Sequence, residues 1–208
     1  MRLAIALLAT ALAASGPALA QSPQRIQPDK SQIRFAFKQM GVAVEGRFRK
    51  FDGQVAFDPK KPEATKAEFE VELASIDLGN ADGEIEAKRK PWLSVEAFPK
   101  AKFAAGSVKS TGPGRFEATG TLTIKGVSQP VTAPFALVEA GGLRTVEGTF
   151  LLKRLAFRIG EGAFMRLSGL VRLGLATALL AGAGAWSDTD TVADEVTVRF
   201  KFVTAVPK

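Results

Sequence analysis

The chain has 208 residues, carries a formal charge of +7 and contains neither cysteine nor histidine. Without these two residue types it lacks the usual ligands of zinc and haem and the usual residues of cysteine or serine-histidine catalysis, so we expect no cofactor, no metal and no enzymatic activity. The charge is modest and spread along the chain with no nucleic-acid-binding motif, so we expect no nucleic-acid partner and only weak attraction to anionic lipid head groups.

The first twenty residues have the layout of a cleavable secretory signal. Arg2 precedes an apolar run from Leu3 to Ala14, and the segment ends in the small residues Ala18-Leu19-Ala20. The apolar part is too short for a spanning helix. We therefore expect residues 1–20 to be a signal peptide cleaved near Ala20, a periplasmic or secreted mature protein, and one β-barrel domain over residues 21–208.

Alternation of apolar and polar residues predicts strands along most of the mature chain. Ile33, Phe35 and Phe37 share one face of the first strand, and a second, bent strand covers 45–57, where Gly53 suggests a bulge or corner. In the third strand Ala67, Phe69, Val71 and Leu73 alternate with three glutamates. The remaining strands are expected over 102–109, 115–125, 130–138, 145–157 and 195–203.

A change of period after Asn80 predicts a short helix. Asp82 and Glu84 stand at its start, and Pro91 ends it. Large apolar side chains follow, and water contact would be costly for them, so we expect this segment to form a lid over one mouth of the sheet. These lid residues are Trp92, Leu93, Val95 and Phe98.

Eight strands joined mostly by short turns predict an all-β fold. We expect an eight-stranded antiparallel up-and-down barrel with one short helical lid and an apolar insertion before the last strand. The insertion, residues 165–185, repeats the order of the N-terminus, since Met165-Arg166-Leu167 matches Met1-Arg2-Leu3. It is short for a membrane-spanning helix, and an interfacial helix or a tolerated surface insertion are the other interpretations. Alternation alone also fits an open sandwich.

The inward-facing apolar positions would form either a lipid tunnel or a filled core, because alternation does not distinguish the two. As lining of a tunnel, they make the candidate ligand-binding residues Phe35, Phe37, Phe69, Val71, Trp92, Phe103, Leu122, Ile124, Phe135, Phe150 and Phe200. Directly before the lid, Lys88, Arg89 and Lys90 could neutralise a phosphate or pyrophosphate head group, or form a solvated helix end.

Two further charged clusters have alternative interpretations. Arg47, Arg49 and Lys50 either contact a membrane surface or cover the outer face of a strand. The acidic residues Asp188, Asp190, Asp194 and Glu195 are spaced loosely like a calcium loop, but they lack its glycine and its distal glutamate. No metal site is therefore expected among them.

The stretch TLTIKGVSQPVTAPF, residues 121–135, resembles the central motif of the YceI-like family. Weaker matches occur in the expected order at Gln39-Met40-Gly41-Val42, Gly46-Arg47-Phe48, Ser75-Ile76-Asp77-Leu78-Gly79, Phe98-Pro99-Lys100-Ala101-Lys102-Phe103 and Ala193-Asp194-Glu195-Val196. The resemblance implies a periplasmic lipocalin-like barrel that binds long isoprenoid or other lipid chains.

On this basis we expect a non-enzymatic lipid carrier that holds an isoprenoid-like chain, either a quinone tail or a polyprenyl phosphate. The alternative is a stress-associated interaction module with a packed barrel that docks onto a membrane partner. Many family members carry a histidine where this chain has Gln39, and residues 80–90 replace another family segment. Head-group contacts made by those residues in relatives therefore do not transfer to this chain.

Overall fold

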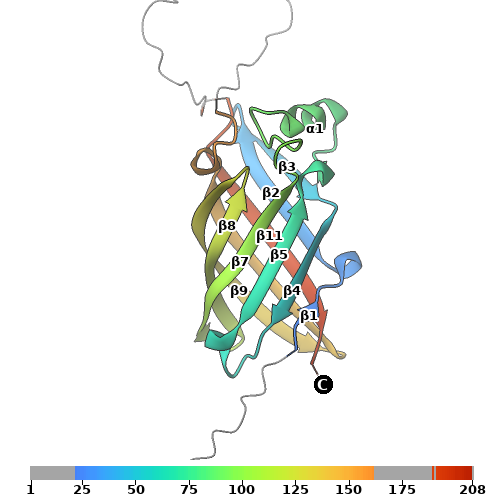
Figure 1. The fold of residues 1–208 in the computed structure, drawn as a ribbon, viewed down its shortest axis with the longest axis vertical. Helices are drawn as coiled ribbons and strands as arrows, with labels where there is room; N and C mark the ends of the chain where they lie inside the picture. The colour runs from blue at the N-terminus through green and yellow to red at the C-terminus, as the bar shows by residue number, and fades with distance from the viewer. Residues whose placement is uncertain (1–21, 162–188, 190, 208) are drawn as a thin grey trace, which may run out of the picture.

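The computed structural model describes residues 22–161, 189 and 191–207, and strands dominate them (Figure 1). All strands belong to one antiparallel sheet with the order β1-β4-β5-β7-β8-β9-β10-β11-β2-β3-β6. Their bounds are β1 Gln24–Arg25, β2 Gln32–Gln39, β3 Val42–Phe48, β4 Phe51–Ala56, β5 Lys66–Glu72, β6 Ile76–Asp77, β7 Lys100–Gly112, β8 Arg115–Ile124, β9 Val127–Ala140, β10 Leu143–Lys153 and β11 Glu195–Ala205. Helix α1 spans Ala81–Lys88, and the 3-10 turns are η1 Pro28–Lys30, η2 Pro62–Ala64, η3 Leu73–Ser75 and η4 Arg154–Phe157.

One bent strand closes the sheet into a barrel. β3 pairs with β2 and β4 pairs with β5, while only Arg49 and Lys50 separate β3 from β4 in the chain. The two sides of the sheet are thus joined through a continuous segment. Of the eleven strands, β1 and β6 have two residues each, and β3 with β4 makes one bent strand. Eight long strands remain, which confirms the predicted antiparallel barrel class.

The sequence located the bend but assigned it to the wrong residues. Gly53 pairs in regular register with Phe69, so it is neither a bulge nor a corner. The chain instead bends at Arg49 and Lys50, where pairing passes from β2 to β5. The register irregularities of the β7–β8 pair lie between Ala105 and Ser107 and between Ser110 and Gly112, as expected where a barrel strand must curve.

Several predicted boundaries also change. The strand expected over 145–157 ends at Lys153, and η4 follows it, with Phe157 only 2% exposed. Strands β7 and β9 are longer than predicted at both ends. Helix α1 is confirmed, and its N-cap is Asn80, whose side-chain oxygen accepts a hydrogen bond from the amide of Gly83 at 2.7 Å.

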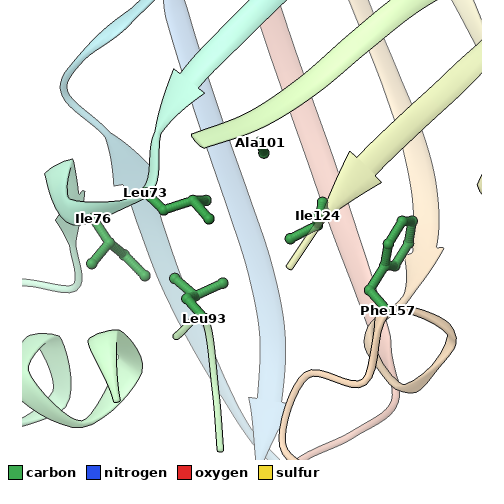
Figure 2. Packing of buried hydrophobic residues seen from close by; sticks show 6 residues of the cluster. All are labelled: Leu73, Ile76, Leu93, Ala101, Ile124 and Phe157. Carbon is green, nitrogen blue, oxygen red and sulfur yellow. The ribbon is translucent and has the colours of Figure 1, made fainter. Parts of the chain in front are cut away.

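Helix α1 and the loop after it cover one end of the barrel, which we call the lid end (Figure 1). Here Leu93 from the loop joins Leu73, Ile76, Ala101, Ile124 and Phe157 in one buried cluster. Figure 2 shows Leu93 beside Leu73 and Ile76, opposite Ile124 and Phe157. The predicted lid is therefore anchored by a buried leucine, although Phe98 at its end remains 37% exposed.

A second apolar cluster fills the opposite end, called the far end, near the C-terminus (Figure 1). Its buried members are Phe57, Val108 and Phe116, and the rings of Phe57 and Phe116 meet edge to face at 5.1 Å. The buried guanidinium of Arg144 donates to the Phe57 carbonyl at 2.5 Å and pairs with Glu139 at 2.6 Å. These contacts satisfy a charge that would otherwise be costly at this depth.

Candidate functional site: an apolar barrel cavity

An apolar cavity of about 310 Å³ occupies the barrel interior. Its wall includes Leu73, Leu93 and Ile124 from the lid-end cluster and Phe57 and Val108 from the far-end cluster. The cavity therefore extends between the two clusters. Its wall is apolar except for Thr65, Arg154 and Thr204. A cavity of this size and lining is typical of a site for a small or chain-like apolar ligand.

All eleven predicted ligand-binding residues lie on the wall of this cavity. The strands bring them together from both sides of the barrel, and Trp92 comes from the lid. The structure thus places the predicted set at one site. Their role as ligand contacts stays a prediction.

Four inward-facing glycines keep the cavity open. Cross-strand neighbours cover three of them, since Gly46 lies opposite Phe35, Gly53 opposite Phe69 and Gly148 opposite Phe200. The ring of Phe103 covers the fourth, Gly120. A methyl group on any of the four would collide with the ring over it, so each ring occupies the place of a missing side chain. The rings therefore lie along the wall instead of filling the lumen.

The wall also contains aromatic residues that the sequence analysis missed. Phe48 and Phe202 line the cavity, and Phe202 stacks on Phe69 with ring centroids 4.3 Å apart and on Phe200 at 5.3 Å. Both residues continue an alternation already visible at Gly46 and Phe200, so the pattern contained the signal that would have identified them. The result is a band of flat aromatic surface around the lumen.

Arg154 is the charged residue on the wall, and no pattern in the sequence identified it. It is 4% exposed and lies at the lid end, where its guanidinium donates to the carbonyls of Ala193, Ile159 and Val192 at 3.1, 2.7 and 2.7 Å. It also lies over the ring of Trp92 at 5.6 Å. Arg154 thus ties η4 to the start of the last strand and to the lid.

The predicted head-group residues are not brought together at the cavity. Lys88, Arg89 and Lys90 are absent from its wall, and Arg89 pairs with Glu86 at 2.9 Å on the helix surface. Only Lys90 lines a second depression, which lies outside the barrel beside the lid. That depression also contains Lys125 and Arg158, two cations that the sequence analysis did not consider.

The basic cluster of Arg47, Arg49 and Lys50 covers the outer face at the bend. Arg47 and Arg49 both donate to one carboxylate oxygen of the buried Asp77, at 2.6 and 3.0 Å. Hydrogen bonds from Arg47 and Arg49, together with one from the Gly79 amide, lower the pKa of Asp77 to about 2. These arginines hold β6 against β3, which accounts for them as part of the fold.

The remaining predicted clusters lie wholly or partly outside the described residues. Segment 165–185 falls there, and so do Asp188 and Asp190, while Asp194 accepts a hydrogen bond from the Leu155 amide at 2.9 Å. Within the described ranges, no three acidic side chains gather as a metal site would require. No described helix has the length and apolar character needed to cross a membrane.

Comparison with known proteins agrees with this geometry. A domain model described as YceI-like matches residues 24–204. The crystal structure of BcnA from Burkholderia cenocepacia aligns with a TM-score of 0.71 and 32% identity, covering 86% of this chain and 98% of BcnA. A polyisoprenoid binding domain from Saccharophagus degradans, implicated in plant cell wall breakdown, aligns at 0.61 but is only 14% identical, which supports the fold alone.

Curated relatives are similar over part of their length. A UPF0312 protein from Azotobacter vinelandii is 34% identical over 110 residues, which is 52% of this chain and 57% of that protein. A UPF0312 protein from Pseudomonas savastanoi pv. phaseolicola is 34% identical over 131 residues, 62% of this chain and 68% of that protein. With the domain match spanning most of the barrel, the chain belongs to the YceI-like family.

Proposed function

We propose that the protein is a non-enzymatic carrier that holds the chain of an isoprenoid-like lipid in its barrel. The observation that carries this proposal is the open, apolar cavity of about 310 Å³ between the two end clusters. The structurally similar domain from Saccharophagus degradans is described as polyisoprenoid binding, and we extend the same class of ligand to this chain as part of the proposal. Either a quinone tail or a polyprenyl phosphate supplies such a chain.

Burial of the chain provides the affinity, and no covalent step is needed. Each 100 Å² of apolar ligand surface removed from water contributes roughly 2.5 kcal/mol, before the cost of immobilising the ligand. The flat rings along the wall suit a branched, unsaturated chain because they offer broad contact without fixed polar partners. The lid then limits escape.

Export to the periplasm is part of the proposal and rests on the signal-like residues 1–20. It places the carrier where lipid chains must cross water between membranes. Mass spectrometry of the protein from a periplasmic fraction should show a mature N-terminus at Gln21. A retained Met1 would contradict export by this route.

A melting experiment with neutral isoprenoid alcohols tests chain binding. Farnesol at about 100 times its dissociation constant should stabilise the fold by roughly 2.7 kcal/mol, a rise in Tm of several degrees. Isopentenol, with a single isoprene unit, is the matched control and should leave Tm unchanged at the same concentration. An unchanged Tm with farnesol and with longer isoprenoids would contradict the proposal.

Docking onto a membrane partner is a second candidate function. The observation that favours it is the exposure of Met40 and Val42, each at 67%, on the hairpin that joins β2 and β3 at the lid end (Figure 1). Deleting residues 165–185 separates the two functions. A carrier should still bind farnesol after the deletion, whereas loss of vesicle association with unchanged farnesol binding would support docking through that segment.

A further inference from the structure

Three segments meet beside the lid, and in each one residue lines the cavity while an adjacent residue lines the outer side. The pairs are Trp92 with Pro91, Ile124 with Lys125, and Ile159 with Arg158, where the first of each pair lines the cavity. The second of each lines the outer depression, which we call the hollow. The hollow is completed by Lys90, Ser94, Phe98 and Glu161. Leu93 and Ser94 divide in the same way, so a seam of adjacent residues lies between the hollow and the lumen.

Polar contacts made by Lys125 hold the seam. Its ammonium donates to the Pro91 carbonyl at 2.9 Å and to the Arg158 carbonyl at 2.6 Å. The Gly160 amide also donates to the Pro91 carbonyl, at 2.8 Å. An ammonium has three N–H donors, so one remains after these two bonds. Lys125 can thus bind an anion in the hollow, either with its third N–H or by releasing one of the two carbonyls.

The hollow has the chemistry of an anion site. Lys90, Lys125 and Arg158 contribute three positive charges, against the single negative charge of Glu161. Burial lowers the pKa of the Lys125 ammonium, an effect that Glu161 opposes and Arg158 reinforces. Ser94 is only 8% exposed, and its hydroxyl makes no hydrogen bond to any residue in the described ranges. The Ser94 hydroxyl therefore has no hydrogen-bond acceptor among the described residues, and a phosphate oxygen in the hollow would supply one.

Backbone strain is concentrated at the same place. Four non-glycine residues among those described have a positive φ, and three of them, Ser94, Lys125 and Arg158, line the hollow. Their φ values are 51°, 50° and 56°, in the left-handed region that disfavours residues with a Cβ. Lys125 occupies the first position of a two-residue hairpin turn before Gly126, where asparagine or glycine fits with less strain. Strain kept at several neighbouring residues is typical of functional sites.

We propose that the hollow is the subsite for the phosphate head group of an amphiphile whose chain lies in the cavity, held by Lys90, Lys125, Arg158 and the Ser94 hydroxyl. This proposal rests on the proposed carrier function and narrows its ligand to a phosphorylated chain. A phosphate head group pairs with the positive charges of the hollow, whereas a neutral quinone head group does not. The chain passes through the seam between Trp92, Ile124 and Ile159. Lys125 exchanges its bond to the Pro91 carbonyl for the phosphate when the seam opens.

Isothermal titration with farnesol and farnesyl phosphate distinguishes head-group binding in the hollow from chain binding in the cavity. The two ligands have the same chain and differ only in the phosphate. Wild-type protein should bind farnesyl phosphate about ten-fold more tightly than farnesol, as expected for charge-assisted hydrogen bonds. The Lys125→Met variant should lose most of this preference, measured as the ratio of its affinities for the two ligands, because any effect of the altered seam on chain binding applies to both ligands. Lys60→Met, at an exposed turn lysine, is the matched control and should keep the preference.

The Ser94→Ala variant provides an independent test if Lys125→Met fails to fold, and it should weaken farnesyl phosphate binding severalfold with farnesol binding unchanged. Equal affinity of wild type for the two ligands would overturn the subsite and leave the carrier function standing. Absence of binding by either ligand would instead overturn the carrier function itself. Binding of inorganic phosphate alone, as tightly as farnesyl phosphate, would assign the hollow to free phosphate and overturn the head-group role.

Discussion

Single inward-facing residues decide whether this barrel is hollow. A lumen lined by ten or more phenylalanine and leucine-sized side chains would fill if every ring pointed to its axis. Here four of the rings lie flat over glycines, which have no side chain to push them inward; these are Gly46, Gly53, Gly120 and Gly148. The sequence contained these glycines and phenylalanines, but their pairing depends on strand register, which alternation does not specify.

Gly46→Ala should reduce the cavity without breaking the wall. The three atoms nearest to a Cβ at Gly46 belong to the side chains of Phe35 and Leu78, so the Phe35 ring must swing toward the lumen. We expect a loss of about 1–2 kcal/mol in unfolding free energy and a several-fold weaker affinity for farnesol. Denaturant unfolding and calorimetric titration measure the two effects.

Gly106→Ala is the control for this substitution, because a Cβ there makes only an ordinary contact of 3.5 Å with the Thr119 carbonyl oxygen. It should leave farnesol affinity unchanged. Farnesol affinity equal to wild type in Gly46→Ala would show that the ring positions do not set the space available to the ligand.

Asp77 should make stability depend on pH in the acid range. Hydrogen bonds from Arg47 and Arg49 lower its pKa to about 2 in the folded state, below the value of roughly 3.9 in an unfolded chain. The stabilisation is therefore fully present above pH ~4 and is lost as the pH falls toward 2. Asp77→Asn should melt at a lower temperature than wild type at pH 7, and the difference should shrink toward zero near pH 2.

Thermal melts of both proteins between pH 2 and 7 measure this dependence. Asp29→Asn is the control, since Asp29 lies on the exposed turn η1 and forms no ion pair within the described residues. A Tm difference between Asp77→Asn and wild type that stays constant across this range would be inconsistent with the arginine-bound carboxylate.

Among the elements, the lid is held less firmly than the strands. Helix α1 has no buried residue, and its segment is attached chiefly through Leu93 and Trp92. The strands, by contrast, share continuous ladders such as the eleven-pair register between β10 and β11. Local opening of the lid is therefore expected to occur without unfolding of the barrel.

Hydrogen exchange followed by mass spectrometry should show this difference. Amides of α1 and the following loop should exchange well before those of β8 to β11, and Leu93→Ala should accelerate exchange in the lid alone. Bound farnesol should slow lid exchange, because Trp92 of the lid lines the cavity in which the ligand is proposed to lie. Equal exchange rates in the lid and the strands would rule out the lid as the mobile element.

The sequence predicted the strands well because they alternate locally, and the helix because its start and stop signals are local. Alternation identified β5 and the β8–β9 hairpin, and the polar start at Asn80 with the stop at Pro91 identified α1. Prediction from the sequence failed where closure of the barrel decides the conformation. The bend at Arg49-Lys50 and the turn η4 after β10 arise from the change of pairing partner, which no local pattern contains.

At the scale of the whole molecule, the site combines predictable and unpredictable parts. The eleven predicted wall residues could be found because inward faces alternate, and closure of the barrel brings them together. Arg154 and the hollow could not be found, because η4, the β8–β9 turn and the lid loop are distant in the chain and meet only in the folded protein. Lys88 and Arg89, chosen for their position next to the lid in the sequence, do not line the cavity, and Arg89 pairs with Glu86 instead.

If the open barrel carries a lipid chain, the protein purified from its own host should still hold that lipid. The protein should be purified from the periplasm of its own host without detergent, extracted with organic solvent under denaturing conditions and examined by mass spectrometry. We expect an isoprenoid-like lipid in near-stoichiometric amount from the wild-type protein, and less of it from Gly46→Ala protein prepared in parallel. Recovery of no lipid from the wild-type protein, with the Gly46→Ala variant indistinguishable from it, would contradict the carrier function.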